Sequence, residues 1–193
     1  MRLDILDHGY SLRTKILFTL IRVFTGQPPP DAAKLTFYRP GFYGAAAKKL
    51  THEVMRGPSA WSVADRELMA AFVSTVNGSA FCIGAHAATA AQAYQDPAKV
   101  AAVLADPDSA PLDEGLRATL WLLGTLTREG RVDAEAMRAV LSTGVSRQQV
   151  EDALAVCAVF NTIDRLADAF DFELLTPEGF DAGANYLLKR GYR

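Results

Sequence analysis

Apolar residues recur at helical spacing along almost the whole chain. The segment 11–24 is one example, in which four apolar residues lie three or four positions apart and so share one side of a helix: Leu12, Ile16, Leu20 and Val23. No stretch shows the sustained alternation of β-branched and polar residues that a strand needs. The pattern therefore predicts an all-α chain.

Helix-breaking residues and capping residues divide this pattern into nine predicted helices. Gln27-Pro28-Pro29-Pro30 and Gly57-Pro58 are the clearest breaks. The predicted helices are Ser11–Phe24, Phe42–Arg56, Val63–Val76, Ser79–Gln95, a short one at Pro97–Leu104, Leu112–Arg128, Asp133–Ser142, Arg147–Phe170 and a last one that starts at Pro177 and is capped by Thr176.

The most apolar part of the chain is predicted to be a buried helical hairpin. Ser62 and Asp65 form a shortened capping box at its start, and Asn77-Gly78 supplies residues that tolerate a left-handed backbone at the turn. Residues 68–95 contain no formally charged side chain, but the turn interrupts them, so a membrane span is not expected. Helices this apolar are covered on most sides by other helices or by another subunit.

Composition limits the function further. A chain of 193 residues that is 50% hydrophobic and 22% charged fits one globular domain, residues 1–193. The net charge of -2 gives no field for a phosphate backbone, so nucleic-acid binding is not expected. Two cysteines make no disulfide framework, and Asp4 and Asp7 do not fit a signal peptide, so we expect a cytoplasmic location. Three histidines and two scattered cysteines predict no metal site, and we expect no cofactor.

Three polar residues share one face of the predicted helix Ser79–Gln95. Ser79, Cys82 and His86 are three and four residues apart. Cys82 lies in the first turn, where unpaired amides and the helix dipole favour an anion. We expect this position, with a protonated His86 one turn later, to lower the pKa of the thiol from its ordinary value of about 8.5. The resulting thiolate is a nucleophile.

Glu67 is predicted to face His86 across the hairpin. It lies about 15 Å before the Asn77-Gly78 turn, and His86 lies about 12 Å after it. If the two helices are antiparallel, the carboxylate meets the imidazole and fixes its tautomer. A purely structural interpretation stays open at this point. Cys82 would then be a small buried hydrophobe, His86 a core histidine and Glu67 a solvated acid in the first helical turn.

The spacing of these residues resembles a known family signature. In this sequence Glu67 is followed by eleven residues and Ser79, then by two residues and Cys82, and then by three residues and His86. This spacing is similar to the pattern Glu-x11-Cys-x2-Cys-x3-His of the AhpD-like alkylhydroperoxidases in the carboxymuconolactone decarboxylase superfamily. Residues 38–44, 56–59 and 161–168 also resemble its peroxidase-related branch, and the resemblance covers residues 35–172. It implies an AhpD-like helical bundle with the motif on a central hairpin, and a homo-oligomer, trimeric or hexameric.

One motif position departs from the family, since Ser79 replaces the first cysteine. The resemblance implies a peroxidatic Cys82 with His86 and Glu67 as its proton relay and a peroxide as substrate. It cannot imply the internal disulfide, because a serine hydroxyl does not resolve a sulfenic acid. An external thiol or dithiol resolves Cys82, or Cys157 does, or the chain is no longer a peroxidase. Ser79 could still position water or donate a hydrogen bond to the thiolate or a peroxide oxygen.

The expected function is therefore a thiol-dependent, antioxidant peroxidase-like oxidoreductase. Two alternatives remain, a non-catalytic oligomer that keeps the fold and a decarboxylase or other proton-transfer enzyme of the superfamily. Cys157 lies in an apolar helical segment and is expected in the core. His52 is expected on a solvated helix face. Asn161, Arg165 and Asp168 share a helix face, which we interpret as a paired arginine that fixes this helix to its neighbours.

Overall fold

The computed structural model describes residues 4–192. Every secondary-structure element within this range is a helix. Its elements, in chain order, are η1 (Asp4–Leu6), α1 (Leu12–Thr25), α2 (Asp31–Tyr38), η2 (Pro40–Gly44), α3 (Ala45–Arg56), α4 (Val63–Asn77), α5 (Ala80–Tyr94), α6 (Pro97–Ala105), α7 (Glu114–Glu129), α8 (Ala134–Ser142), α9 (Arg147–Ala169) and α10 (Pro177–Arg190). The predicted all-α fold is confirmed.

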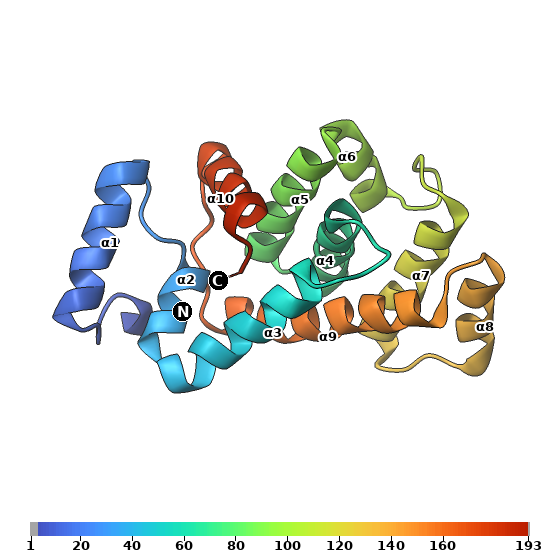
Figure 1. Cartoon of the computed structure of the whole chain (residues 1–193), viewed down its shortest axis with the longest axis horizontal. Helices are drawn as coiled ribbons and strands as arrows, with labels where there is room; N and C mark the ends of the chain where they lie inside the picture. Colours follow the sequence, from blue (N-terminus) through green and yellow to red (C-terminus); the bar gives the residue numbers. More distant parts are fainter. Residues whose placement is uncertain (1–3, 193) are drawn as a thin grey trace.

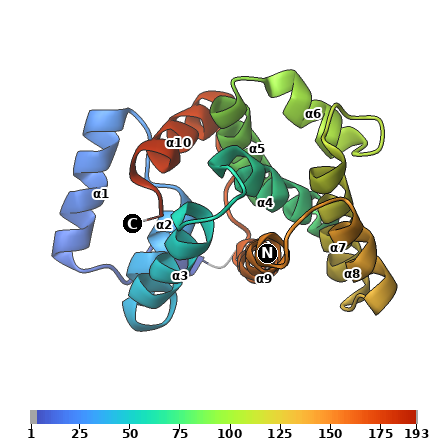
Figure 2. The ribbon, with the colours of Figure 1, turned by 45° about the vertical axis from the view of Figure 1, so that its right-hand side comes forward.

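Helix α4 lies at the centre of the molecule, surrounded by α3, α5, α6, α7 and α9 (Figures 1 and 2). Every side chain from Arg66 to Ser74 is buried. Nine consecutive residues cover more than two turns, so no side of α4 is left for solvent. The sequence alone did not show whether other helices of this chain or another subunit cover α4. In the structure, the chain's own helices do so.

The hairpin of α4 and α5 forms as predicted. Both halves of the capping box are present, since Ser62 accepts a hydrogen bond from the Asp65 amide and the Asp65 side chain accepts from the Ser62 amide. Gly78 ends α4 with a φ of 75°, and its amide donates to the carbonyls of Ser74 and Thr75. This left-handed residue reverses the chain, so α5 runs back along α4.

The first third of the chain differs from the predicted helices. Helix α2 was not predicted, and the helix expected from Phe42 begins at Ala45, because Pro40–Gly44 forms the short π-helix η2. The apolar residues predicted along one side of the first helix lie largely in solvent, since Leu12 and Val23 are more than 70% exposed. Periodicity identifies an apolar face without showing whether the same chain covers it. No helix within residues 4–192 has the length and apolarity to cross a bilayer.

Helix α10 packs against α5 at Gly84. A Cβ placed on Gly84 would lie 2.5 Å from Cζ of Phe180, so only glycine permits this approach without a shift of the ring. The close packing of α10 matters for the site, because Tyr192, two residues after the end of α10, contacts Glu67.

We expect Gly84→Ala to lower the free energy of unfolding by about 1 kcal/mol. The gain in helix propensity is about 1 kcal/mol, whereas overpacking against Phe180 costs about 1–3 kcal/mol. Gly183→Ala is the matched control on α10, because nothing lies within 4 Å of its added Cβ. That variant should gain up to about 1 kcal/mol. Urea unfolding of both variants measures the difference, and equal gains would contradict the proposed constraint.

Candidate active site

The hairpin brings Glu67 and His86 together. Oε2 of Glu67 lies 2.7 Å from Nδ1 of His86, so the carboxylate and the imidazole are directly hydrogen bonded. The Glu67 side chain is 0% exposed, and His86 is also buried. The contact spans the two antiparallel helices at the level that their lengths predict. The pair can hold or transfer a proton at the imidazole.

Two further residues, which the sequence analysis did not identify, bind the other oxygen of the same carboxylate. Arg56 donates from Nη2 to Oε1 of Glu67 at 2.6 Å, and the Tyr192 hydroxyl donates to Oε1 at 2.9 Å. Arg56 ends α3, and Tyr192 follows α10 after Gly191, which has a φ of 67°. No spacing in the sequence signals either contact, because both depend on how α3 and α10 dock.

Glu67 is held as a carboxylate by these neighbours. Burial is the largest effect on its pKa and would raise it, but the hydrogen bond and charge of His86, together with Arg56, outweigh burial and lower the pKa below its usual value. Burial, followed by the charge of Glu67, raises the pKa of the Tyr192 hydroxyl well above its usual value. Tyr192 therefore remains a neutral hydrogen-bond donor to the carboxylate.

Aromatic rings enclose the imidazole of His86. The Phe160 ring meets it edge-on with centroids 4.4 Å apart, and the Tyr192 ring lies almost parallel to it at 6.3 Å.

The Tyr192 amide also donates to Nδ1 of His52 at 3.3 Å. The expectation that His52 lies on a solvated face is therefore wrong, since it is half-buried against the segment that closes the site.

Cys82 contacts a different carboxylate. Its side chain is 2% exposed, and its thiol is hydrogen bonded to Asp164 of α9. Asp164 is completely buried and also accepts from Ser74 Oγ at 2.8 Å and from Asn77 Nδ2 at 2.7 Å. Three neutral donors therefore surround this carboxylate, and none of them comes from a basic residue. The sequence analysis did not identify Asp164, because its contacts are with residues about 90 positions earlier.

This environment opposes a thiolate at Cys82. Burial has the largest effect on the pKa of the thiol and raises it, the charge and hydrogen bond of Asp164 raise it further, and the hydrogen bond with Ser79 offsets only part of the rise. The expectation that the helix N-terminus would lower this pKa is wrong. Burial also raises the pKa of Asp164, although its hydrogen bonds with Asn77, Ser74 and Cys82 act in the opposite direction.

Ser79 is completely buried and is tied to α9. Its Oγ donates to Oδ1 of Asp168 at 2.8 Å, and it makes no side-chain capping bond to the start of α5.

Arg165, by contrast, is exposed and donates to the carbonyl and the side chain of Asn161 on its own helix. The interpretation that a paired arginine fixes this helix is therefore wrong. Asp164 and Asp168 make the connections to the hairpin.

Cys157 occupies the core position that was expected and is not joined to Cys82, since both cysteines are free thiols. Asn161 Nδ2 donates to Cys157 Sγ at 3.2 Å, and Thr127 Oγ1 lies 3.5 Å away. Burial raises the pKa of this thiol as well. Within residues 4–192, no three His, Cys, Asp or Glu side chains gather in a way that could hold a metal ion.

Comparison with known proteins gives a family for the central part of the chain. Residues 43–123 match the carboxymuconolactone decarboxylase family. This range includes Glu67, Ser79, Cys82 and His86. No curated protein matches the chain at a significant level.

Solved structures share the fold over nearly the whole chain. A peroxidase-related protein from Silicibacter sp. TM1040 is 24% identical, with a TM-score of 0.78 over 92% of this chain and 94% of that one. A peroxidase-related protein with an alkylhydroperoxidase AhpD core, from Ralstonia eutropha JMP134, is 19% identical, with a TM-score of 0.74 over 91% of each chain. Residues 43–123 are thus similar to the carboxymuconolactone decarboxylase family, and nearly the whole chain shares the fold of these peroxidase-related, AhpD-like structures.

Proposed function

We propose that the protein is a thiol-dependent, peroxidase-like oxidoreductase that reduces a hydroperoxide through the single cysteine Cys82. The observation that carries this proposal is the placement of Cys82 one helical turn before His86, whose imidazole is hydrogen bonded to the ionised Glu67. A nucleophile and a proton relay therefore occupy one face of α5. The peroxidase-related names of the similar structures agree with this assignment.

The contacts suggest how protons move in such a reaction. The thiol of Cys82 passes its proton to Asp164, its hydrogen-bond partner. The sulfur then attacks the distal peroxide oxygen, an S–O bond forms, and the O–O bond breaks, so Cys82 is oxidised to a sulfenic acid. The leaving oxygen takes a proton from the relay of His86 and Glu67, or the one held by Asp164, and departs as an alcohol or water.

Reduction of the sulfenic acid requires a thiol from outside the chain. Ser79 cannot form a disulfide, and Cys157 is held in the core by Asn161 and Thr127. A small thiol or a protein dithiol restores Cys82 through a mixed disulfide, with two electrons from the reductant. This reductant, a cytoplasmic location and a homo-oligomer, trimeric or hexameric, remain predictions.

A second function is favoured by a different observation. The most completely hydrogen-bonded part of the site is Glu67 with His86, Arg56 and Tyr192, whereas Cys82 lies in surroundings that keep its thiol protonated. A proton-transfer enzyme, such as a decarboxylase of the superfamily, would use the imidazole and carboxylate and would not need the thiol.

We expect one equivalent of hydroperoxide to oxidise Cys82 alone. Intact-mass spectrometry of the reduced protein, with a sulfenic-acid trap present, should show one adduct in the wild type and in Cys157→Ser, and none in Cys82→Ser. A disulfide that either substitution abolishes would assign the resolving role to Cys157. No modification of the wild type would rule out the peroxidase proposal.

Glu67→Gln and Cys82→Ala together separate the two candidate functions. For the peroxidase, the loss of the carboxylate should slow sulfenic-acid formation by about 100-fold, the usual scale of a general acid–base contribution. The matched control is Glu53→Gln, the same change at an exposed position of α3, which should leave the rate unchanged. If the protein is instead a proton-transfer enzyme, Glu67→Gln abolishes that activity while Cys82→Ala retains it.

Asp164→Asn tests the electrostatics of the thiol. In a Cys157→Ser background, we expect alkylation of Cys82 by iodoacetamide at pH 8 to become about tenfold faster, because a negative charge at hydrogen-bonding range is removed. The peroxide reaction should nevertheless slow down, since the acceptor of the thiol proton is lost.

The control for this experiment is Asp152→Asn, also on α9, whose carboxylate bonds Ser59 and Gln148. It should change neither rate. If Asp164→Asn accelerates both reactions, Asp164 only holds the thiol in its protonated form and does not act as its base.

A further inference from the structure

Helices α7 and α9 border a groove that lies outside the candidate active site. The groove has a volume of about 600 Å³ and is open to solvent, and neither Cys82 nor His86 lines it. Residues 154–166 of α9 form one wall over about 18 Å of helix, and residues 126–130 at the end of α7 form the other. Pockets that bind small molecules in proteins have volumes of about 300–1,000 Å³, so the groove is large enough for such a ligand.

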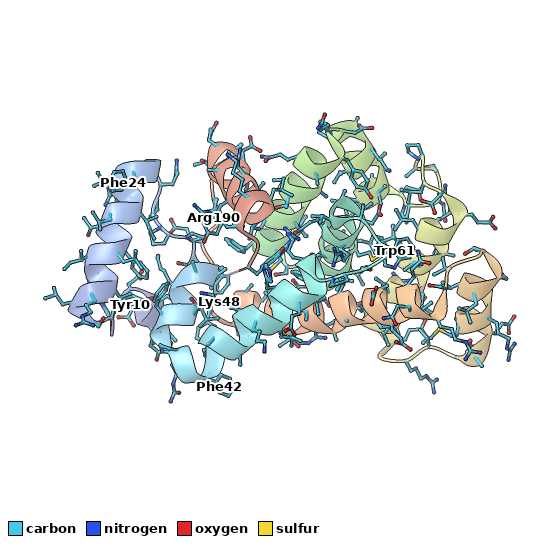
Figure 3. All side chains as sticks on the ribbon, viewed as in Figure 1. Tyr10, Phe24, Phe42, Lys48, Trp61 and Arg190 are labelled. Carbon is cyan, nitrogen blue, oxygen red and sulfur yellow. The ribbon has the colours of Figure 1, made fainter. Side chains whose placement is uncertain are left out.

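The helix that forms the longer wall is fixed on both sides of the groove. Near its start Trp61, which is labelled in Figure 3, donates from Nε1 to the Gln149 carbonyl at 2.8 Å. Towards its end Asp164 accepts from Ser74 Oγ, and Asp168 accepts from Ser79 Oγ, each at 2.8 Å. The shape of the groove is therefore set before a ligand binds, which reduces the entropy lost on binding.

Most of the groove is lined by hydrocarbon. Leu126 of α7 faces it together with Leu154, Ala158 and Leu166 of α9, and the three leucines are half-buried. Burial of these side chains under an apolar ligand would remove more of their surface from water. The lining therefore favours a ligand with a hydrocarbon chain.

The uncharged polar groups of the groove are already hydrogen bonded within the chain. Asn161 Nδ2 donates to Thr127 Oγ1 at 3.1 Å and to Cys157 Sγ at 3.2 Å. The Thr162 hydroxyl donates to the Ala158 carbonyl at 3.0 Å. These groups shape the polar side of the groove, and none of them supplies a charge to a ligand.

Arg165 is the only charged side chain among the described residues that line the groove. It is exposed, and it takes part in none of the ion pairs found within residues 4–192. Its Nη1 donates to the carbonyl and to Oδ1 of Asn161, whereas its Nε and Nη2 have no acceptor in the same range. Nε and Nη2 form the edge of a guanidinium that binds both oxygens of a carboxylate.

We infer that the groove between α7 and α9 binds a small organic anion, a monocarboxylate with a hydrocarbon chain. The carboxylate pairs with Arg165, and the chain lies along Leu126, Leu154 and Ala158. A single guanidinium matches a single negative charge, whereas a dianionic phosphate would keep one charge without a partner. The inference goes beyond the proposed peroxidase and does not depend on it, because the groove does not include Cys82.

Calorimetric titration of the full chain with decanoate tests the ligand class. We expect one decanoate per chain, with a dissociation constant in the millimolar range or below. Decyltrimethylammonium carries the same chain and the opposite charge, and it should bind at least about tenfold more weakly. Acetate, which lacks the chain, should show no measurable binding.

Two substitutions test the place of binding. Arg165→Gln should raise the dissociation constant of decanoate at least about tenfold, because a charge-assisted pair is lost. Ala158→Trp should have an effect of the same size, since the ring fills the groove from an exposed position of α9. Arg147→Gln is the matched control, because Arg147 is exposed on α9 and does not line the groove. Far-UV circular dichroism verifies the helix content of each variant.

Several results would overturn the inference. They are a wild type that does not bind decanoate, equal affinity for decyltrimethylammonium, and a dissociation constant that either groove variant leaves unchanged. It is also overturned if Leu20→Glu, on the exposed apolar side of α1, abolishes decanoate binding while the groove variants retain it. The probe would then bind to α1.

Discussion

The buried carboxylate of Glu67 is the constraint on which the rest of the site depends. An ionised group without exposed surface costs several kcal/mol to desolvate unless donors surround it. Its donors are His86, Arg56 and Tyr192. They belong to α5, to the end of α3 and to the residues after α10, so stabilising one charge on α4 fixes the positions of three other segments. Gly84, which admits α10 against α5, is part of the same requirement.

The surroundings of the Cys82 thiol favour a retained proton, whereas those of Glu67 favour an ionised group. Glu67 is paired with a guanidinium, whereas the donors to Asp164 are neutral, namely Ser74, Asn77 and the Cys82 thiol. A proton is therefore retained between Cys82 and Asp164 instead of being released. Ser79, which donates to the exposed Asp168, fits this arrangement, since a hydroxyl is a stronger donor to a carboxylate than a thiol is. The replacement of the first motif cysteine is thus integrated into the packing of α5 against α9.

Sequence reasoning succeeded where the determining contacts are local and failed where they are distant. The hairpin and the pairing of Glu67 with His86 follow from two helix lengths and one turn, so spacing predicted them. The raised pKa of Cys82 depends first on burial and then on Asp164, more than 80 positions later in the chain, and the local dipole argument gave the wrong sign. Tyr192 was missed for the same reason. The catalytic roles of Cys82, His86, Glu67 and Ser79 stay predictions.

The contrast between α4 and α1 shows what apolar periodicity means in this chain. Helix α10 lies between α1 and α5 in both ribbon views (Figures 1 and 2). Helix α4 is covered by five helices of its own chain, whereas α1 presents six apolar side chains outward.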